Sequence, residues 1–281
     1  RNIICATMRF FILKHKKYVM RQIDRKGLMQ QLLPIARAAG DSIMAVYFRG
    51  MQVVQFKADD SPITEADLAA HCVLASQLKP LLSECPVVSE EDAGSLVHRQ
   101  SYGRFWLIDP LDGTKEFIAR NGEFTVNIAL IEDGRCVLGV VYASAIDALY
   151  WGGASLGAFR CMGGQTAAIK VATSNPAKVS RVVASKSHLN EATRSLIDRL
   201  GEVSLVQAGS SLKFCRVAEG EADIYPRLAP TCEWDTAAAQ AVLEGAGGVV
   251  VGLQGMTLLY GKPDVLNPSF IATRDTALIP T

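Results

Sequence analysis

The sequence contains no Cys-x-x-Cys pair, although it has seven cysteines. Because their number is odd and their spacing irregular, they predict neither a disulfide framework nor a zinc site, and we expect free, buried thiols. The sequence also lacks an excess of charge of either sign, since 29 basic and 28 acidic residues leave a formal net charge of +1. No global positive field therefore favours nucleic acid, and the motifs of nucleic-acid-binding modules are missing. An anionic substrate would need a local site.

Long apolar runs are also missing, so no bilayer-spanning segment is predicted. Residues 1–28 are expected to form a poorly structured basic leader. Within it, residues 9–17 combine basic and apolar side chains and could contact an anionic membrane surface without stable insertion. We therefore expect a cytoplasmic protein that could associate peripherally with the inner membrane. The oligomeric state cannot be predicted from the sequence.

The first half of the chain is expected to place two helices before a sheet. The helices are predicted at 29–48 and from Thr64, as N-cap, to residue 82. The first tolerates Pro34 only if that residue lies in or near its first turn. Strands are predicted at 86–89, 104–108, 124–131, 137–142, 150–151 and 158–160, with a hairpin turn at 132–134. The turn-rich segment 161–165 is a candidate change of domain.

The second half alternates strands and helices. Strands are predicted at 181–185, 203–206 and 222–226, and helices at 190–200, 209–220 and 236–245. Such alternation predicts a mixed or parallel sheet covered by helices. We therefore divide the chain into the leader, an N-terminal α+β part at 29–162 and a C-terminal α/β part at 163–281.

Acidic residues gather where strands end or helices begin. Four clusters stand out: Glu65/Asp67, Glu90-Glu91-Asp92, Asp109/Asp112 and Glu233/Asp235. Carboxylates that converge at one edge of a sheet would repel each other unless a divalent cation neutralised them. Hard oxygen ligands of this kind suit Mg²⁺.

The segment 106–114, Trp-Leu-Ile-Asp-Pro-Leu-Asp-Gly-Thr, is the most informative. Asp109 follows an apolar strand, Pro110 stiffens the turn, and Gly113 permits an unusual backbone angle. Asp112 can then return to the metal region, while free amides near Gly113 and Thr114 would suit a phosphate. Taken alone, the motif would be interpreted as a surface turn. The long strand before it and the distant acidic clusters favour a site.

This motif, together with Trp-Asp-Thr-Ala-Ala at 234–238 and Ser-Glu-Glu-Asp at 89–92, resembles the lithium-sensitive, Mg²⁺-dependent inositol monophosphatase superfamily. The resemblance extends from about Met29 to Phe270. It implies an α/β (α+β) fold, a layered αβαβα sandwich of the inositol monophosphatase and sugar phosphatase type. Segments 109–124, 185–188, 209–215 and 225–227 look closest to the bacterial 3′(2′),5′-bisphosphate nucleotidases.

The resemblance also implies the roles of individual residues. Two Mg²⁺ ions, with Asp109 bridging, would be held by Glu90, Asp109, the backbone carbonyl of Leu111, Asp112 and Asp235; a third, weaker ion could touch Glu90. The catalytic residues would be Asp67 and Thr114, which orient and deprotonate the attacking water, and Glu90. Two-metal catalysis of this kind activates water and offsets charge in the transition state.

Substrate contacts are expected mainly from the second half. The predicted set is Gly113, Thr114, Lys115, Ser185, Lys186, His188, Ser210, Ser211, Lys213, Arg227 and Asp235. Lys213 supplies charge one turn into a helix, and Arg227 offers a planar fork for phosphate. For each residue alone the alternative is an ordinary surface position. Glu65 is interpreted as a first-turn helix acid, and Glu233 is left undecided.

The reaction implied is hydrolysis of the 3′-phosphate of 3′-phosphoadenosine 5′-phosphate to AMP and phosphate, with 3′-phosphoadenylyl sulfate as a further substrate. The family resemblance places such a phosphatase in sulfate assimilation, as a lithium-sensitive hydrolase. Inositol monophosphatase activity is the alternative within the same chemistry, and a sugar bisphosphatase is less favoured. A non-catalytic nucleotide or metal sensor is the alternative from another class. Every position needed for two metals and a water is filled, which disfavours the sensor.

Overall fold

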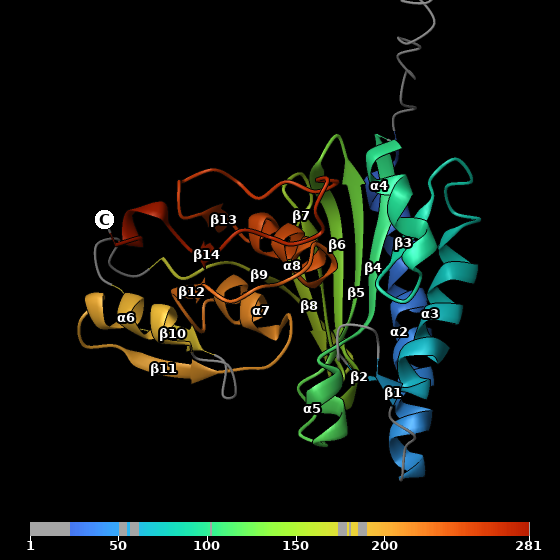
Figure 1. Cartoon of the computed structure of the whole chain (residues 1–281), viewed down its shortest axis with the longest axis horizontal. Coiled ribbons are helices and arrows are strands. Elements are labelled where there is room, and N and C mark those ends of the chain that lie inside the picture. Colours follow the sequence, from blue (N-terminus) through green and yellow to red (C-terminus); the bar gives the residue numbers. More distant parts are fainter. Residues whose placement is uncertain are drawn as a thin grey trace, which may run out of the picture.

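The computed structural model describes residues 23–50, 55–56, 62–101, 103–173, 179, 181–184 and 190–280. Helices and sheets alternate in five layers (Figure 1). In order, these are helices α2 (Arg25–Arg49) and α3 (Glu65–Leu78), a seven-stranded sheet, helices α7 (Leu212–Ala218) and α8 (Trp234–Gly245), a five-stranded sheet, and helix α6 (Glu191–Arg199). The predicted αβαβα fold class is confirmed. No helix within these described ranges is both long and apolar enough to cross a membrane.

The seven-stranded sheet separates two hydrophobic cores. Its strands, in spatial order, are β3 (Val87–Ser89), β4 (Arg104–Asp112), β5 (Thr125–Glu132), β6 (Arg135–Ala143), β7 (Ala148–Gly153), β8 (Gly157–Met162) and β9 (Gln165–Ile169). Only the β3–β4 pairing among them is parallel. Side chains alternate along β4: Trp106 and Ile108 join the core under α2 and α3, whereas Phe105 and Leu107 join the core that contains α8. Both faces of the sheet are therefore covered, as its apolar strands require.

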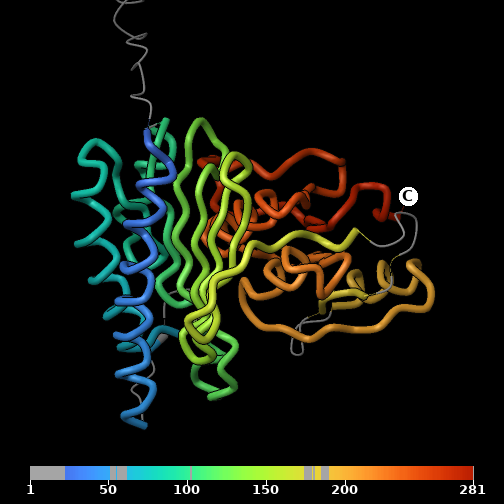
Figure 2. Tube along the Cα trace, turned by 180° about the vertical axis from the view of Figure 1, so that it is seen from behind, coloured from blue at the N-terminus to red at the C-terminus, as the bar shows by residue number. Residues whose placement is uncertain are grey.

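The chain leaves this sheet later than the turn signals indicate. Gly163 and Gly164 have positive φ angles and form the hairpin turn between β8 and β9, which pair antiparallel. The predicted change of domain at 161–165 is therefore a hairpin within one sheet. Figure 2 shows the chain passing from the yellow-green strands to the orange and red part. We propose that the boundary between the two parts lies in the segment between Ile169 and Arg181.

The five-stranded sheet is mixed, as predicted. Its order is β11 (Ser204–Gln207), β10 (Arg181–Ala184), β12 (Ile224–Arg227), β14 (Phe270–Thr273) and β13 (Val249–Gly252). Strands β11, β10 and β12 are parallel, and β14 runs antiparallel between β12 and β13. Strand β14 was not predicted: residues after Phe270 were interpreted as a tail. A four-residue apolar run gives no periodicity, so only its two pairing partners define it.

Helix α2 corrects two expectations. It begins at Arg25, where the Asp24 side chain accepts a hydrogen bond from Gly27 N, rather than at Met29. Pro34 lies well inside the helix and not in its first turn. Because Pro34 is exposed, the carbonyl that its missing N–H leaves free can be hydrated. The remainder of the predicted leader, residues 1–22, lies outside the described residues.

Short elements complete the described part of the chain. They are β1 (Gln55–Phe56), β2 (Pro62–Ile63), η1 (Ala93–Val97), α4 (His98–Ser101), α5 (Thr114–Ile118), η2 (Ser144–Ile146) and η3 (Thr276–Leu278).

Glycines let α8 lie close against the large sheet. A Cβ on Gly139 of β6 would overlap the Ala238 carbonyl, and a Cβ on Gly245 would come 2.6 Å from Gly157 O. Such close packing fixes the distance between α8 and the sheet. It brings Asp235, in the first turn of α8, beside the end of β4.

Candidate metal centre and active site

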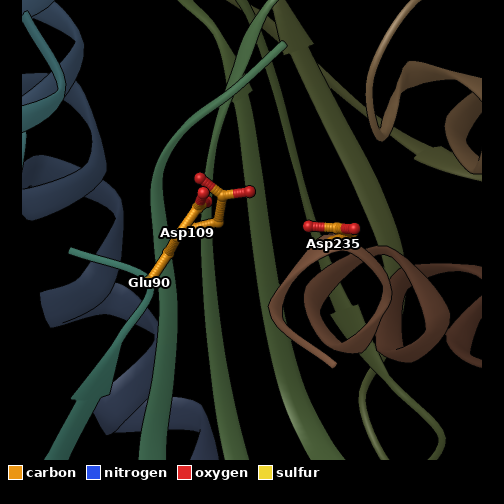
Figure 3. A group of neighbouring side chains, drawn as sticks. All are labelled: Glu90, Asp109 and Asp235. Atoms are coloured by element: carbon orange, nitrogen blue, oxygen red, sulfur yellow. The ribbon is translucent and has the colours of Figure 1, made fainter. Parts of the chain in front are cut away.

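Three carboxylates from separate elements converge at the junction of the two parts. They belong to Glu90 after β3, Asp109 on β4 and Asp235 in α8, and one oxygen of each lies within 4.8 Å of the other two. Figure 3 shows Glu90 and Asp109 side by side, with Asp235 facing them from the end of α8. Asp109 is only 1% exposed. The predicted convergence of acidic clusters is thus present for these three residues.

The electrostatics of this group favour a bound cation. Burial, followed by the charges of Glu90, Asp112 and Asp235, raises the pKa of Asp109 well above its usual range. Burial and the charges of Asp112 and Glu90 raise the pKa of Asp235 in the same way. Like charges this close are costly in a medium of low dielectric constant. The all-oxygen donor set fits a hard divalent cation, which would neutralise the charges.

Strand β4 ends in an irregular segment that contains Asp109 and Asp112. The strand was expected to stop at Asp109 but continues through Pro110 to Asp112, with a shift of register against β5 between the two aspartates. Proline has no backbone N–H, and Pro110 is tolerated because a residue in a bulge does not need to donate a hydrogen bond to the neighbouring strand. Leu111 N donates to Asp109 Oδ1 at 3.1 Å, and Gly113 then takes φ of +91° as the N-cap of α5.

Asp67 and Thr114 contact each other although they are far apart in sequence. Thr114 Oγ1 donates to Asp67 Oδ1 at 3.1 Å. Asp67 Oδ2 accepts from Thr64 N at 2.7 Å and Thr64 Oγ1 at 2.6 Å, which completes a capping box at the start of α3. Thr64 is the predicted N-cap. Burial raises the pKa of Asp67, an effect that these hydrogen bonds partly offset. The Thr114 hydroxyl therefore donates to the buried carboxylate of Asp67.

Asp112 is held by Asn127 of β5 and by the serines at the start of α7. Its Oδ2 accepts from Ser211 N at 2.7 Å, Ser211 Oγ at 2.9 Å and Asn127 Nδ2 at 3.3 Å. Ser210 Oγ donates to the Asp112 and Glu123 carbonyls, each at 2.8 Å. The hydroxyls of both serines, expected as substrate contacts, thus bond to the protein itself. Asp112 raises the pKa of its neighbours but lies outside the group of three carboxylates.

The sequence interpretation missed Asn127. The sequence signal for Asn127 is a polar side chain in the mainly apolar strand β5. Asn127 is 1% exposed. A buried amide needs partners. Besides Asp112, Asn127 Nδ2 bonds Ser211 Oγ at 2.9 Å.

Cationic side chains lie next to the acidic group. Lys213 is 8% exposed, which excludes the solvated helix face that was its alternative. Its Nζ lies 5.7 Å from the centroid of the Tyr225 ring, and burial lowers its pKa to about 8. Arg227 is half-buried; its Nη2 donates to Pro230 O at 3.3 Å, and its buried Nε has no hydrogen-bond partner in the described part of the chain. Lys115 is exposed. The predicted contacts Ser185, Lys186 and His188 lie outside the described residues.

The layered sandwich with an acidic site between β4 and α8 belongs to a known class. The model of the inositol monophosphatase family matches residues 24–280, so the chain is a member of this family. The matched range is longer at both ends than the resemblance inferred from the sequence motifs, which extends from about Met29 to Phe270. The family is metal-dependent, in agreement with an acidic cluster that could hold a metal ion.

Within the family, the chain is similar to bisphosphate nucleotidases. It is 47% identical over 249 residues to the 3′(2′),5′-bisphosphate nucleotidase CysQ of Salmonella typhimurium, covering 88% of this chain and 99% of the relative. It is 48% identical over 246 residues to the enzyme of the same name from Escherichia coli (strain K12), covering 86% and 98%. The crystal structure of CysQ from Bacteroides thetaiotaomicron superposes with a TM-score of 0.78 at 38% identity, covering 90% of this chain and 98% of the other.

Proposed function

We propose that this protein is a 3′(2′),5′-bisphosphate nucleotidase that hydrolyses the 3′-phosphate of 3′-phosphoadenosine 5′-phosphate to AMP and phosphate. The observation that carries the proposal is the buried cation of Lys213 beside a buried acidic group. A site of this kind suits a substrate with one phosphate at the metal centre and a second phosphate at a protein cation. Identity of 47–48% with two bisphosphate nucleotidases supports this assignment. The 3′-phosphoadenylyl sulfate is a further candidate substrate.

The metal is proposed to be Mg²⁺, with two ions and a weaker third at Glu90. The proposed ligands are Glu90, Asp109, the Leu111 carbonyl, Asp112 and Asp235. A magnesium ion held by these residues would supply a lower pKa for water and would offset charge in the transition state. The buried carboxylate of Asp109 and the half-buried carboxylates of Glu90 and Asp235 supply the negative charge that would retain it.

Residues of the protein are proposed to handle the proton and the two phosphates. Thr114 orients the attacking water, and its hydroxyl passes the proton to Asp67, to which it already donates. Gly113 and Thr114 border the phosphate that is cleaved, while Lys213 and Arg227 attract the 5′-phosphate. Further proposed substrate contacts are Lys115, Ser185, Lys186, His188, Ser210, Ser211 and Asp235.

In the cell, the proposed reaction would remove a by-product of sulfate assimilation. Inhibition by lithium is proposed on the basis of the family resemblance. Both proposed substrates are small nucleotides.

The decisive experiment compares phosphate release from 3′-phosphoadenosine 5′-phosphate and inositol 1-phosphate, each with Mg²⁺. We expect strong preference for the nucleotide and no release in chelator. A preference for inositol 1-phosphate would replace the nucleotidase by the alternative that gives the family its name. Turnover of neither substrate by protein that binds metal would favour a sensor. Asp109→Asn should abolish release under all conditions.

A further inference from the structure

An ionic cluster that none of the proposed catalytic roles uses lies at the start of α8, two residues before Asp235. Its centre is Glu233, which is fully buried. The Glu233 carboxylate accepts from Arg99 Nη1 at 3.0 Å and Gly261 N at 3.0 Å through Oε2, and from Lys262 N at 2.9 Å and Lys262 Nζ at 2.6 Å through Oε1. Four donors from three residues thus saturate both oxygens of one carboxylate. Such a network holds its members in a single arrangement.

Glu233 is close in sequence to a proposed metal ligand. It is the residue before α8 begins, and Asp235 lies in the first turn of that helix. The backbone on the other side is fixed as well: Glu233 N donates to Val265 O at 2.9 Å, and Cys232 N donates to Asp235 Oδ2 at 2.7 Å. A displacement of Glu233 would therefore move the Asp235 carboxylate.

Arg99 connects the cluster to the segment that follows β3. It lies in α4, which follows η1 and the segment that carries Glu90. Arg99 is 6% exposed, and its Nη1 also donates to Lys262 O at 3.1 Å. The cluster thus joins the segment after β3 to the start of α8. These two segments carry Glu90 and Asp235, whose charges repel each other.

We propose that Glu233 is a positioning residue for the metal centre: clamped by Arg99 and Lys262, it holds the start of α8 so that Asp235 stays within ligating distance of Glu90 and Asp109. The repulsion between the three carboxylates favours separation of α8 from β4, and the clamp opposes it. Groups behind the direct ligands typically change metal affinity by about 10–100-fold when they are replaced. The inference rests on the proposed metal site.

The test measures metal affinity directly, with Mn²⁺ as the probe and the metal-free full-length protein. We expect Glu233→Gln to weaken Mn²⁺ binding by about 10–100-fold in calorimetry, at a temperature at which the variant is fully folded. Saturating Mg²⁺ should restore most of kcat, and KM for the nucleotide should not change. Arg99→Lys, which keeps the positive charge, should lose less affinity than Arg99→Met.

Asp223→Asn is the matched control. Asp223 is 2% exposed and pairs with Arg274 Nε at 3.0 Å and Arg181 Nη2 at 3.1 Å, at the ends of strands of the five-stranded sheet. Its replacement should lower the melting temperature and leave Mn²⁺ affinity unchanged. If Glu233→Gln behaves like this control, with lower stability and unchanged affinity, the positioning role is refuted.

The two Arg99 variants and a further variant, Asp109→Asn, separate the possible failures. If Glu233→Gln does not fold, the two Arg99 variants test the proposal instead. Unchanged Mn²⁺ affinity in Arg99→Met refutes the proposal. Weakened affinity in Arg99→Met, with a smaller loss in Arg99→Lys, supports it. Asp109→Asn should remove Mn²⁺ binding altogether. If it does not, the metal site itself is misassigned, which is a failure of the proposed function and of everything that rests on it.

Discussion

The hydroxyl of Ser210 fills the space beside the α-carbon of Gly113, so that a Cβ on Gly113 would overlap Ser210 Oγ. Both residues have left-handed backbones, with φ of +91° at Gly113 and +43° at Ser210. Ser210 uses the same hydroxyl to bond the Asp112 carbonyl at 2.8 Å. The turn after β4 and the turn before α7 therefore fit together at this point, and they join the two sheets at the site.

Gly113→Ala should lower kcat/KM for phosphate release by about 100-fold or more, because a displacement of about 1 Å among reacting groups can have an effect of this size. The added methyl would push Ser210 and the Asp112 turn apart. Phosphate release from the nucleotide at saturating Mg²⁺ is the measurement.

Gly255→Ala is the control for backbone strain alone. Gly255 has φ of +77° and nothing within 4 Å of the position of a Cβ. Its replacement should cost about 1–2 kcal/mol of stability, from the left-handed backbone, and leave kcat/KM unchanged. An active Gly113→Ala enzyme would show that the fit between the two turns has no part in catalysis.

The metal-free protein should become more stable as the pH falls. Burial and mutual repulsion raise the folded pKa of Asp109 and Asp235. Between the ordinary carboxyl pKa of about 4 and these raised values, the folded state holds more protons than the unfolded state. The stabilisation that comes from protonating these two carboxyl groups is therefore fully present at a pH below both pKa values. It is lost as the pH rises through the raised pKa values of the folded state. Melting curves in chelator at several pH values will test the direction.

Asp109→Asn identifies the source of that pH dependence. In chelator near neutral pH, the variant should melt several degrees above the parent, since about 1 kcal/mol corresponds to about 2–4 °C in a large domain. Its melting temperature should depend less on pH and should not respond to Mg²⁺. A lower melting temperature would mean that repulsion at Asp109 does not destabilise the metal-free protein.

Binding of the nucleotide should weaken above the pKa of Lys213. Burial lowers that pKa to about 8, so the ammonium loses its proton as the pH rises through this value. KM for the nucleotide should then rise by up to about tenfold per pH unit if the charge carries the contact. Lys213→Ala should mainly raise KM.

Lys213→Arg provides the matched comparison for this pH effect. A guanidinium stays charged throughout the range, so KM of this variant should be nearly constant between about pH 7 and 9.5. The same rise of KM in Lys213→Arg would assign the titration to another group.

Local signals were sufficient for most of the fold. Two apolar runs on either side of the turn at 132–134 identified β5 and β6 with their hairpin, and Thr64 identified the start of α3. Two features failed because they depend on distant partners. Strand β14 is defined by pairing with β12 and β13, and the Gly163-Gly164 turn is a hairpin because β8 and β9 pair around it.

The site was predictable only as far as its motifs extend. The spacing of acidic residues and the family resemblance identified Glu90, Asp109 and Asp235, which do converge. Nothing local could show that Asn127 and Ser211 would saturate one oxygen of Asp112, because the three residues come from three separate segments. Tertiary packing makes that contact.

Thr114→Val should lower kcat by about 10²–10⁴-fold while metal affinity and KM change little. The range is that of a positioned proton transfer, and the variant removes the hydroxyl that donates to Asp67. Thr114→Ser keeps the hydroxyl and should keep most of the activity. Single-turnover phosphate release at saturating Mg²⁺ measures the chemical step. A Thr114→Val enzyme that keeps its kcat would refute the role of the hydroxyl, and an equal loss in Thr114→Ser would show that the hydroxyl alone is not sufficient.

Asp67→Asn then distinguishes proton acceptance from helix capping, since Asp67 serves both. Its Oδ2 caps α3 through the bonds from Thr64, and an asparagine oxygen can replace it there. Stability should therefore fall by less than about 1 kcal/mol, whereas the amide cannot take up a proton and kcat should fall as in Thr114→Val. If activity is lost only in proportion to unfolded protein, the carboxylate is a cap and the proton goes elsewhere. Loss of kcat at an unchanged melting temperature assigns the proton to Asp67.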